Sequence, residues 1–279
     1  MVDFIKMNIW GCDVTYIEEH PLLNFVGSYY CKTAESIPRK KAHYKGIDFI
    51  LFDNGLLRIQ GSIHKFFNEG KHNYNDFTFS MIQQVLRKLA NTFHINLDKA
   101  IISNFETGVN IRPPKASKDV LDSLLCHKNT SFKDVSRIGG YIKQAEHSQY
   151  IVKVYDKGLQ YGLNSPNMRI ELKFTRMARI NKIGIKCLSD LLDLNKYQRL
   201  KDMVLEEWQN CLLFESPENS FTMTKKLYQW KDGKYWTSLT KQERYRQRLA
   251  YNKYVDSSTK NYHAKIKEIT VEKFKALLR

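Results

Sequence analysis

Residues 147–175, with the sequence HSQYIVKVYDKGLQYGLNSPNMRIELKFT, carry the pattern that decides the fold. Two segments in this stretch, 150–157 and 168–175, alternate apolar and polar side chains, and a turn-rich segment separates them. Because successive side chains of a β-strand point to opposite faces, each segment is predicted to be a strand with an apolar face and a polar face. The polar faces would carry Lys153, Tyr155 and Lys157 from the first strand and Arg169, Glu171 and Lys173 from the second.

The charge of the chain indicates a polyanionic partner. Its 279 residues carry a formal net charge of +16, and the sequence pI is near 9.5. Residues 221–279 alone contain 15 Lys and Arg against 5 Asp and Glu, interleaved with tyrosines and tryptophans. Clustered cations gain free energy on phosphates by counterion release, and aromatic rings stack on unpaired bases. DNA is therefore the expected partner, and the alternative is a basic helical subdomain whose tyrosines are core residues.

The cysteines and the apolar runs exclude several classes of protein. The five cysteines are scattered and form no C-x-x-C pair, so neither a zinc ribbon nor a disulfide scaffold is expected. The first residues lack the basic start and apolar run of a signal peptide. No apolar stretch approaches the roughly 20 residues of a membrane span. We expect a soluble intracellular protein with no membrane partner.

Upstream of residue 147 the pattern predicts a mixed sheet and helix arrangement. Two apolar runs around Asp53, Asn54 and Gly55 predict a hairpin within residues 44–67, because these residues tolerate the positive φ of a tight turn. Residues 75–93 have helical spacing, with Asp76 or Asn75 as the expected N-cap. A strand over 99–111 would carry Asn104, Glu106 and Asn110 on its polar face. Residues 137–157 are predicted to form a second hairpin that leads into the stretch 147–175.

These elements together predict an α+β fold. We expect an antiparallel sheet with helices packed on one face and an active-site polar face on the other, followed by a mostly helical, basic C-terminal region. The spacing of leucines after residue 173 predicts helices up to about residue 213, and SPENS at 216–220 is expected to be a linker or cap. The predicted domains are 1–214, a catalytic domain, and 215–279, a basic and aromatic-rich DNA-binding or accessory region.

The polar faces together suggest a chemistry. The second strand of the 44–67 hairpin would add Ser62 and His64 to the polar faces of the other three strands. If these four strands share one sheet, a tyrosine, carboxylates, an imidazole and lysines converge. A free tyrosine has a pKa of about 10, so its oxygen attacks phosphorus usefully only where cations or a metal favour the phenolate. Carboxylates and a neutral imidazole can hold Mg²⁺ or Mn²⁺ against a phosphate oxygen. The alternative is that these residues are the solvated face of an antiparallel sheet.

The order of five short motifs resembles a known family. They are GSIHK at 61–65, the HN of KHNYNDF at 71–77, NFETGVN at 104–110, YIVKVYDK at 150–157 and RIELK at 169–173. This order is similar to that of the rolling-circle replication initiators of filamentous phages (the gene II type) and of small Gram-positive plasmids, which are divergent relatives of the His-hydrophobic-His nucleases. The resemblance spans Gly46 to Phe174 and rests on order and spacing rather than on a long identical run.

The resemblance implies an endonuclease that nicks one strand at an origin, keeps the 5′ phosphate on a tyrosine and leaves a 3′ hydroxyl as primer. It implies Mg²⁺ or Mn²⁺ as cofactor, origin DNA as partner in single-stranded or supercoiled duplex form, a host helicase and polymerase as further partners, and the cytoplasm of a bacterial host. The implied site residues are catalytic Tyr155 and Lys157, metal-binding Glu106, Glu171 and His72, and DNA-binding Ser62, His64, Lys65, Asn73, Asn110, Lys153, Arg169 and Lys173.

The sequence departs from the family pattern at several points. Glu106 stands where the family usually has Asp, and Asn110 stands where plasmid members often have a second Asp. There is no His-x-His triplet, which leaves the third metal ligand open between His72 and His64. Two rival interpretations stay open. One is a mobilisation relaxase or transposase with the same chemistry, and the other is a non-catalytic protein that binds an origin without cutting it.

Overall fold

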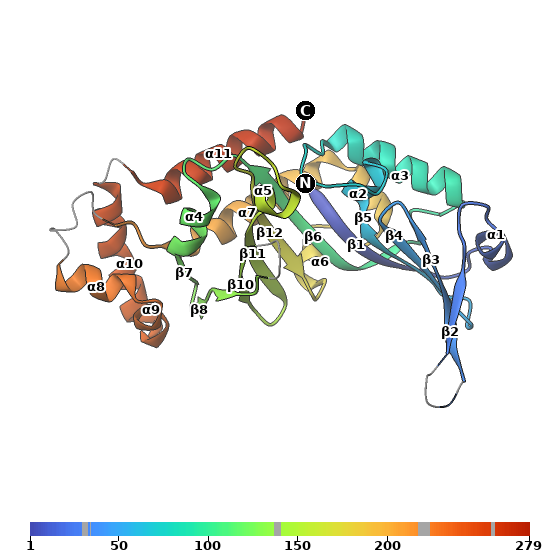
Figure 1. Ribbon diagram of the computed structural model, residues 1–279, viewed down its shortest axis with the longest axis horizontal. Coiled ribbons are helices and arrows are strands. Elements are labelled where there is room, and N and C mark those ends of the chain that lie inside the picture. The colour runs from blue at the N-terminus through green and yellow to red at the C-terminus, as the bar shows by residue number, and fades with distance from the viewer. Residues whose placement is uncertain (30–32, 34, 137–140, 217–223, 258–259) are drawn as a thin grey trace. The chain divides into compact units, whose positions relative to one another are not determined.

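The computed structural model describes all residues except 30–32, 34, 137–140, 217–223 and 258–259 (Figure 1). The chain divides into two compact units, one made of Met1–Gly108, Lys173–Lys201 and Lys275–Arg279, the other of Val109–Leu172 and Asp202–Phe274. Ten of the described strands form a large sheet in the order β2-β3-β4-β5-β1-β6-β12-β11-β10-β9, with helices around it and a helical C-terminal region. The predicted α+β class is confirmed. The domain boundary at residue 214 stays a prediction.

Strand pairing in the first unit follows the predicted hairpin. Its strands are β1 (Val2–Ile9), β2 (Val26–Tyr29), β3 (Ser36–Tyr44), β4 (Ile47–Phe52), β5 (Leu57–Ser62) and the larger part of β6 (Ile101–Ile111). β4 and β5 pair antiparallel, and Gly55 in the turn between them has a φ of 80°. A β-carbon is disfavoured at such a positive φ, which explains why the turn carries glycine.

The predicted helix over 75–93 begins later than expected. Helix α3 spans Phe79–Phe93, and its N-cap is Thr78, whose side chain accepts a hydrogen bond from the backbone N–H of Met81 at 3.3 Å. The expected caps, Asp76 and Asn75, lie outside the helix, so that part of the prediction is wrong. The buried face of α3 comprises Ile82, Val85, Leu86, Leu89 and Phe93.

The second unit holds the second predicted hairpin. β10 (Ile142–Glu146) and β11 (Tyr150–Asp156) pair antiparallel, and β12 (Met168–Phe174) lies beside β11 in the sheet order. Residues 137–140 of the predicted hairpin lie outside the described part. The unit's smaller elements are α4 (Ser117–Ser123), β7 (Leu124–His127), β8 (Thr130–Ser131), β9 (Lys133–Asp134) and β13 (Cys211–Leu213).

The region after residue 173 is largely helical, as predicted. It contains α6 (Ala178–Lys182), the 3₁₀ helix η1 (Leu188–Leu192), α7 (Leu194–Gln209), α8 (Lys225–Lys231), α9 (Gly233–Ser238), α10 (Lys241–Asp256) and α11 (Tyr262–Leu277). Of the predicted linker at 216–220, only Ser216 is described. None of the described helices combines the length and the apolar character that crossing a bilayer takes.

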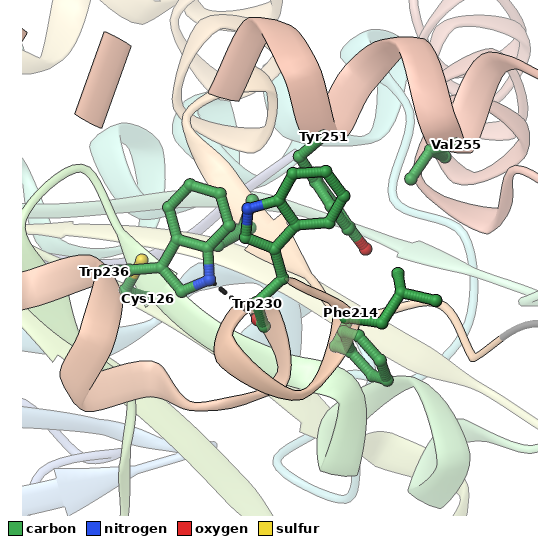
Figure 2. Packing of buried hydrophobic residues seen from close by; sticks show 8 residues of the cluster. Cys126, Phe214, Trp230, Trp236, Tyr251 and Val255 are labelled. Carbon is green, nitrogen blue, oxygen red and sulfur yellow. Dashed lines mark hydrogen bonds between the residues drawn. The ribbon is translucent and has the colours of Figure 1, made fainter. Parts of the chain in front are cut away.

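Aromatic residues of α8, α9 and α10 form a core with β7 and β13. Figure 2 shows Trp230, Trp236 and Tyr251 packed against each other with Cys126 and Phe214. The indole N–H of Trp236 donates to the backbone oxygen of Trp230 at 2.7 Å, and the Tyr251 hydroxyl donates to the Leu213 oxygen at 2.6 Å.

Other rings of the same helices lie outside this core. Tyr228 and Tyr245 are 63% and 66% exposed. The alternative interpretation, in which the tyrosines of this region are core residues, is therefore right for Tyr251 and wrong for Tyr228 and Tyr245.

A buried polar network fixes the start of β11. The carboxylate of Glu207 on α7 lies 2.9 Å from His127 Nε2 and 2.8 Å from Lys128 Nζ. The Tyr150 hydroxyl donates to Glu207 at 3.0 Å, and His127 Nδ1 lies 2.7 Å from His147 Nε2. Because buried charges persist only when well paired, this network ties the start of β11 to β7 and α7.

We predict that Trp236→Ala lowers the free energy of unfolding by about 3–5 kcal/mol, because it removes a fully buried ring from the core of Figure 2. Urea or guanidinium unfolding measures this change. The matched control is Tyr228→Ala, an exposed aromatic of the same region, which should change the free energy by less than about 0.5 kcal/mol. Equal losses in the two variants would show that the ring cluster is not the core of this region.

Candidate active site

The end of strand β11 sets the position of the two predicted catalytic residues. The valines of β11 are buried, so Tyr155 points to the opposite face of the strand. Asp156 is the N-cap of the next helix, α5 (Lys157–Tyr161), and its carboxylate accepts a hydrogen bond from the backbone N–H of Leu159 at 2.9 Å. The strand therefore turns into a helix directly after the tyrosine.

Lys157 belongs to α5 and not to the strand. The prediction that it stands outward on the polar face of the strand is wrong, because the residue is only 1% exposed. Its Nζ lies 5.2 Å from the ring centroid of Tyr155 and 5.4 Å from that of Tyr161. A cation over an aromatic face is attracted by the ring quadrupole. Lys157 thus places a buried positive charge beside the tyrosine ring.

Hydrogen bonds join five polar residues of the second unit in a network centred on the carboxylate of Glu171. The Tyr155 hydroxyl donates to Glu171 Oε2 at 3.2 Å, and Arg169 Nε donates to the same oxygen at 2.7 Å. Lys153 Nζ donates to Glu171 Oε1 at 3.1 Å. On its far side, Arg169 donates through Nη1 to Asn110 Oδ1 at 3.0 Å. The sequence pattern predicts that these side chains share a face, and in the second unit they do.

This polar face is buried. Arg169 and Glu171 are each 2% exposed, so the alternative of a solvated sheet face is wrong for β12. Burial by itself raises the pKa of Glu171, but Arg169 and Lys153 outweigh it and hold the pKa well below its ordinary value. Glu171 is therefore ionised at neutral pH. Three cations therefore lie close to Tyr155 or to the carboxylate that accepts its hydrogen bond, namely Lys153, Lys157 and Arg169.

In the first unit, polar residues gather around Asp3, which the sequence pattern did not single out. Ser62 donates a short hydrogen bond to Asp3, and Asn73 Nδ2 donates to Asp3 Oδ2 at 2.7 Å. Asp3 lies on the same face of β1 as the buried residues Ile5 and Met7. A carboxylate on an apolar strand face needs buried hydrogen-bond donors, so the position of Asp3 in the alternating pattern could have revealed this polar cluster.

Ser62 and His64 lie at a junction between β5 and the short helix α2 (Ile63–Phe67). Ser62 is the N-cap and accepts a hydrogen bond from the backbone N–H of Lys65 at 3.0 Å, so His64 is helical and does not lie on the polar face of the strand as predicted. The His64 ring stacks on Phe77 and its Nε2 lies 2.8 Å from Asn75 Oδ1. These contacts give His64 a packing role.

The other predicted site residues of the first unit, His72, Glu106 and Lys65, each have their own surroundings. The His72 ring stacks on Tyr74 at 4.1 Å, and its buried Nδ1 has no hydrogen-bond partner in the structure. Glu106 is nearly buried, and its Oε1 lies 3.3 Å from Lys173 Nζ. Lys65 is partly exposed. Alternation along β6 places Glu106 and Asn110 on the same side of that strand.

Of the predicted metal ligands, Glu106 and His72 belong to the first unit and Glu171 to the second. Within the part of the chain that the structure describes, no group of three or more His, Cys, Asp or Glu side chains could hold a metal ion. Glu171 already accepts hydrogen bonds from two cationic side chains. The side chains present at Glu171 therefore do not fit a metal ion, and the role of Glu106 and His72 as ligands stays a prediction.

We predict that Asp3→Ala lowers the free energy of unfolding by about 1–3 kcal/mol, because Ser62 and Asn73 lose a buried acceptor. Chemical denaturation measures the loss. Glu19→Ala, which removes an exposed carboxylate from the same unit, is the control and should be nearly neutral. A neutral Asp3→Ala would mean that the group around Asp3 adds nothing to stability.

The chain has a structural likeness to a known replication protein. No protein-family model matches the sequence, and no curated protein matches it either. The chain is similar to the solved structure of the rolling circle replication initiator protein from Geobacillus stearothermophilus, with a TM-score of 0.41 and 12% identity over 82% of this chain and 90% of that chain. At this TM-score and identity the likeness assigns no function to the chain by itself.

Proposed function

We propose that this protein is a replication initiation endonuclease that nicks one DNA strand at an origin through a 5′-phosphotyrosine intermediate and rejoins it, as in rolling-circle replication of a phage or plasmid. The observation that carries the proposal is the setting of Tyr155. The Tyr155 hydroxyl, Lys153 and Arg169 all donate hydrogen bonds to the buried carboxylate of Glu171. The ammonium group of Lys157 lies over the Tyr155 ring. Cations so placed are suited to a phosphodiester and to charge that develops during its cleavage.

The proposed reaction is a transesterification. The oxygen of Tyr155 attacks phosphorus, the bond from phosphorus to the 3′ oxygen breaks, and the proton lost by the tyrosine is balanced by one gained at the 3′ oxygen. The bond energy is kept in the phosphotyrosine, so joining needs no nucleotide cofactor. Lys157 and Arg169 stabilise the negative charge on the phosphate while the bonds exchange.

The remaining expectations belong to the same proposal. The family resemblance implies Mg²⁺ or Mn²⁺, which would polarise the phosphate, and a host helicase and polymerase that extend the 3′ hydroxyl. It also implies action in the cytoplasm of a bacterial host. A mobilisation relaxase or transposase would use the same residues, and genetic context distinguishes it from an initiator.

Tyr155→Phe is predicted to abolish the covalent adduct while leaving DNA binding intact, because phenylalanine keeps the ring and removes the nucleophile. The measurement is a denaturing gel of protein with supercoiled and single-stranded candidate origins, in Mg²⁺ or Mn²⁺, followed by peptide mapping of the adduct.

Tyr161→Phe is the matched control, since Tyr161 also lies beside Lys157 and should not be needed for the adduct. An adduct that forms equally well with Tyr155→Phe would exclude the assigned nucleophile. No adduct from the wild type over a broad set of origins would count against the enzyme itself.

The helix α10 supports a role in DNA binding. Its inward arginines are committed to the fold, because Arg244 Nε donates to the Trp236 oxygen at 2.9 Å and Arg248 Nη2 donates to the Asn210 oxygen at 2.7 Å. Of its acidic residues, Glu243 forms a capping box with Thr240, and Asp256, the last residue of the helix, accepts a hydrogen bond from Asn261.

The outward face of α10 carries cations and neutral side chains along most of its length, and its one carboxylate, Asp256, lies at the C-terminal end of the helix. This face consists of Gln242, Tyr245, Arg246, Leu249, Asn252, Lys253 and Asp256. The 16 residues of α10 make a helix of about 24 Å, and the major groove of duplex DNA admits a helix. Two residues connect α9 to α10, and in known helix-turn-helix proteins the second helix enters the groove. We propose that this outward face contacts duplex DNA.

Arg246→Ala and Lys253→Ala are each predicted to weaken DNA binding. Each should also reduce the steepness of the plot of log association constant against log salt concentration, by about one for each phosphate contact that is lost. Fluorescence anisotropy over a salt series measures both. The control is Lys182→Ala, an exposed lysine of the first unit. Unchanged slopes in the α10 variants would place the DNA elsewhere.

The chief rival from another class is a non-catalytic origin-binding protein. It would show the same salt dependence through α10 but no covalent product with any DNA or metal. The two assays together therefore separate an enzyme from a binder.

A further inference from the structure

Glu171 is the predicted metal ligand whose surroundings are least suited to a metal. Both of its oxygens accept hydrogen bonds from cations, Oε2 from Arg169 at 2.7 Å and Oε1 from Lys153 at 3.1 Å. Oε2 also accepts from the Tyr155 hydroxyl at 3.2 Å. A divalent ion on either oxygen would approach a side chain that is already positive.

The cations around Glu171 are held in place. Arg169 is 2% exposed and its guanidinium also donates to Asn110, so it has no solvated position to which a metal could displace it without breaking a second contact. Removing one partner of a buried ion pair leaves an uncompensated buried charge, which is strongly destabilising. Ligation by Glu171 would therefore require a rearrangement of the buried face of β12.

We propose that Glu171 is a positioning residue and not a metal ligand: it orients the hydroxyl of Tyr155 and holds Arg169 and Lys153 as a cationic pair for the scissile phosphate. This inference rests on the proposed tyrosine chemistry and assigns a different role to one of its residues. A single carboxylate explains all three hydrogen bonds at once, since each of its donors would be a reacting or phosphate-binding group.

The charge of Glu171 also decides what it does with the proton. Arg169 and Lys153 donate hydrogen bonds to its two oxygens and so stabilise the charged form of the carboxylate, which makes Glu171 a weak proton acceptor. It accepts the hydrogen bond of the tyrosine and so orients the phenol oxygen, while the proton that Tyr155 loses as the bond to phosphorus forms is balanced by the one that the 3′ oxygen gains. When the phosphate arrives, its oxygens supply further acceptors for the cations that Glu171 has aligned.

The test compares Glu171→Gln with the wild type in two assays. Glutamine keeps an acceptor for the tyrosine but loses the charge that holds the cations. We expect single-turnover nicking to slow by about 100-fold, as for a misplaced reacting group, while the Mn²⁺ concentration for half-maximal rate stays within about 2-fold. Direct Mn²⁺ binding, followed by electron paramagnetic resonance without DNA, should be unchanged.

A control variant and a second Glu171 variant distinguish a loss of positioning from a loss of folding. Glu146→Gln, an exposed carboxylate of the same unit, should match the wild type in both assays. If Glu171→Gln unfolds, Glu171→Asp keeps the charge with a shorter reach and should slow nicking without weakening Mn²⁺ binding.

A drop in Mn²⁺ affinity of about 10-fold or more in a folded Glu171 variant would overturn the inference and restore the ligand role. Full nicking activity in that variant would also overturn it. Absence of nicking in the wild type would instead refute the proposed function, while the Mn²⁺ measurement still decides whether Glu171 is a ligand.

Discussion

The ion pair of Arg169 and Glu171 is the constraint on which the candidate site depends. Taking both charges out of water costs several kcal/mol for each ion, and the cost is offset only by close geometry and additional hydrogen bonds. Here Lys153, Tyr155 and Asn110 supply those bonds. The orientation of the tyrosine thus follows from the hydrogen bonds that satisfy a buried carboxylate, and the contacts that stabilise β12 are the ones on which the proposed site depends.

The sequence predicted the strands and their apolar faces well, because period-two alternation reports a local property of the chain. Val152 and Val154 are buried as the pattern requires, and Tyr155, Glu171, Arg169, Lys153 and Asn110 meet as expected. The alternation did not reveal that the polar face of β12 is covered as well. Whether a face is covered depends on segments distant in sequence, about which the period of one strand says nothing.

The errors at single residues share a cause. Ser62 and Asp156 each end a strand and cap a short helix, so His64 and Lys157 leave the strand register that the pattern assigned to them. Serine and aspartate favour N-caps as well as strand ends and turns, and a helix of one turn is too short to show its own periodicity. Asp3 was missed for a different reason, since its donors come from 59 and 70 residues away.

The difference between the inward and the outward face of α10 affects how the protein can change during evolution. The inward face is fixed by Trp230, Trp236 and the committed arginines, so substitutions there disturb the core (Figure 2). The outward face contributes little to folding, and exposed substitutions on it are close to neutral for stability. If α10 binds DNA and Tyr155 is the nucleophile, as proposed, a surface of this kind can drift toward a new target sequence while the chemistry around Tyr155 is conserved. Target preference and catalytic machinery would then be free to diverge at different rates within one chain.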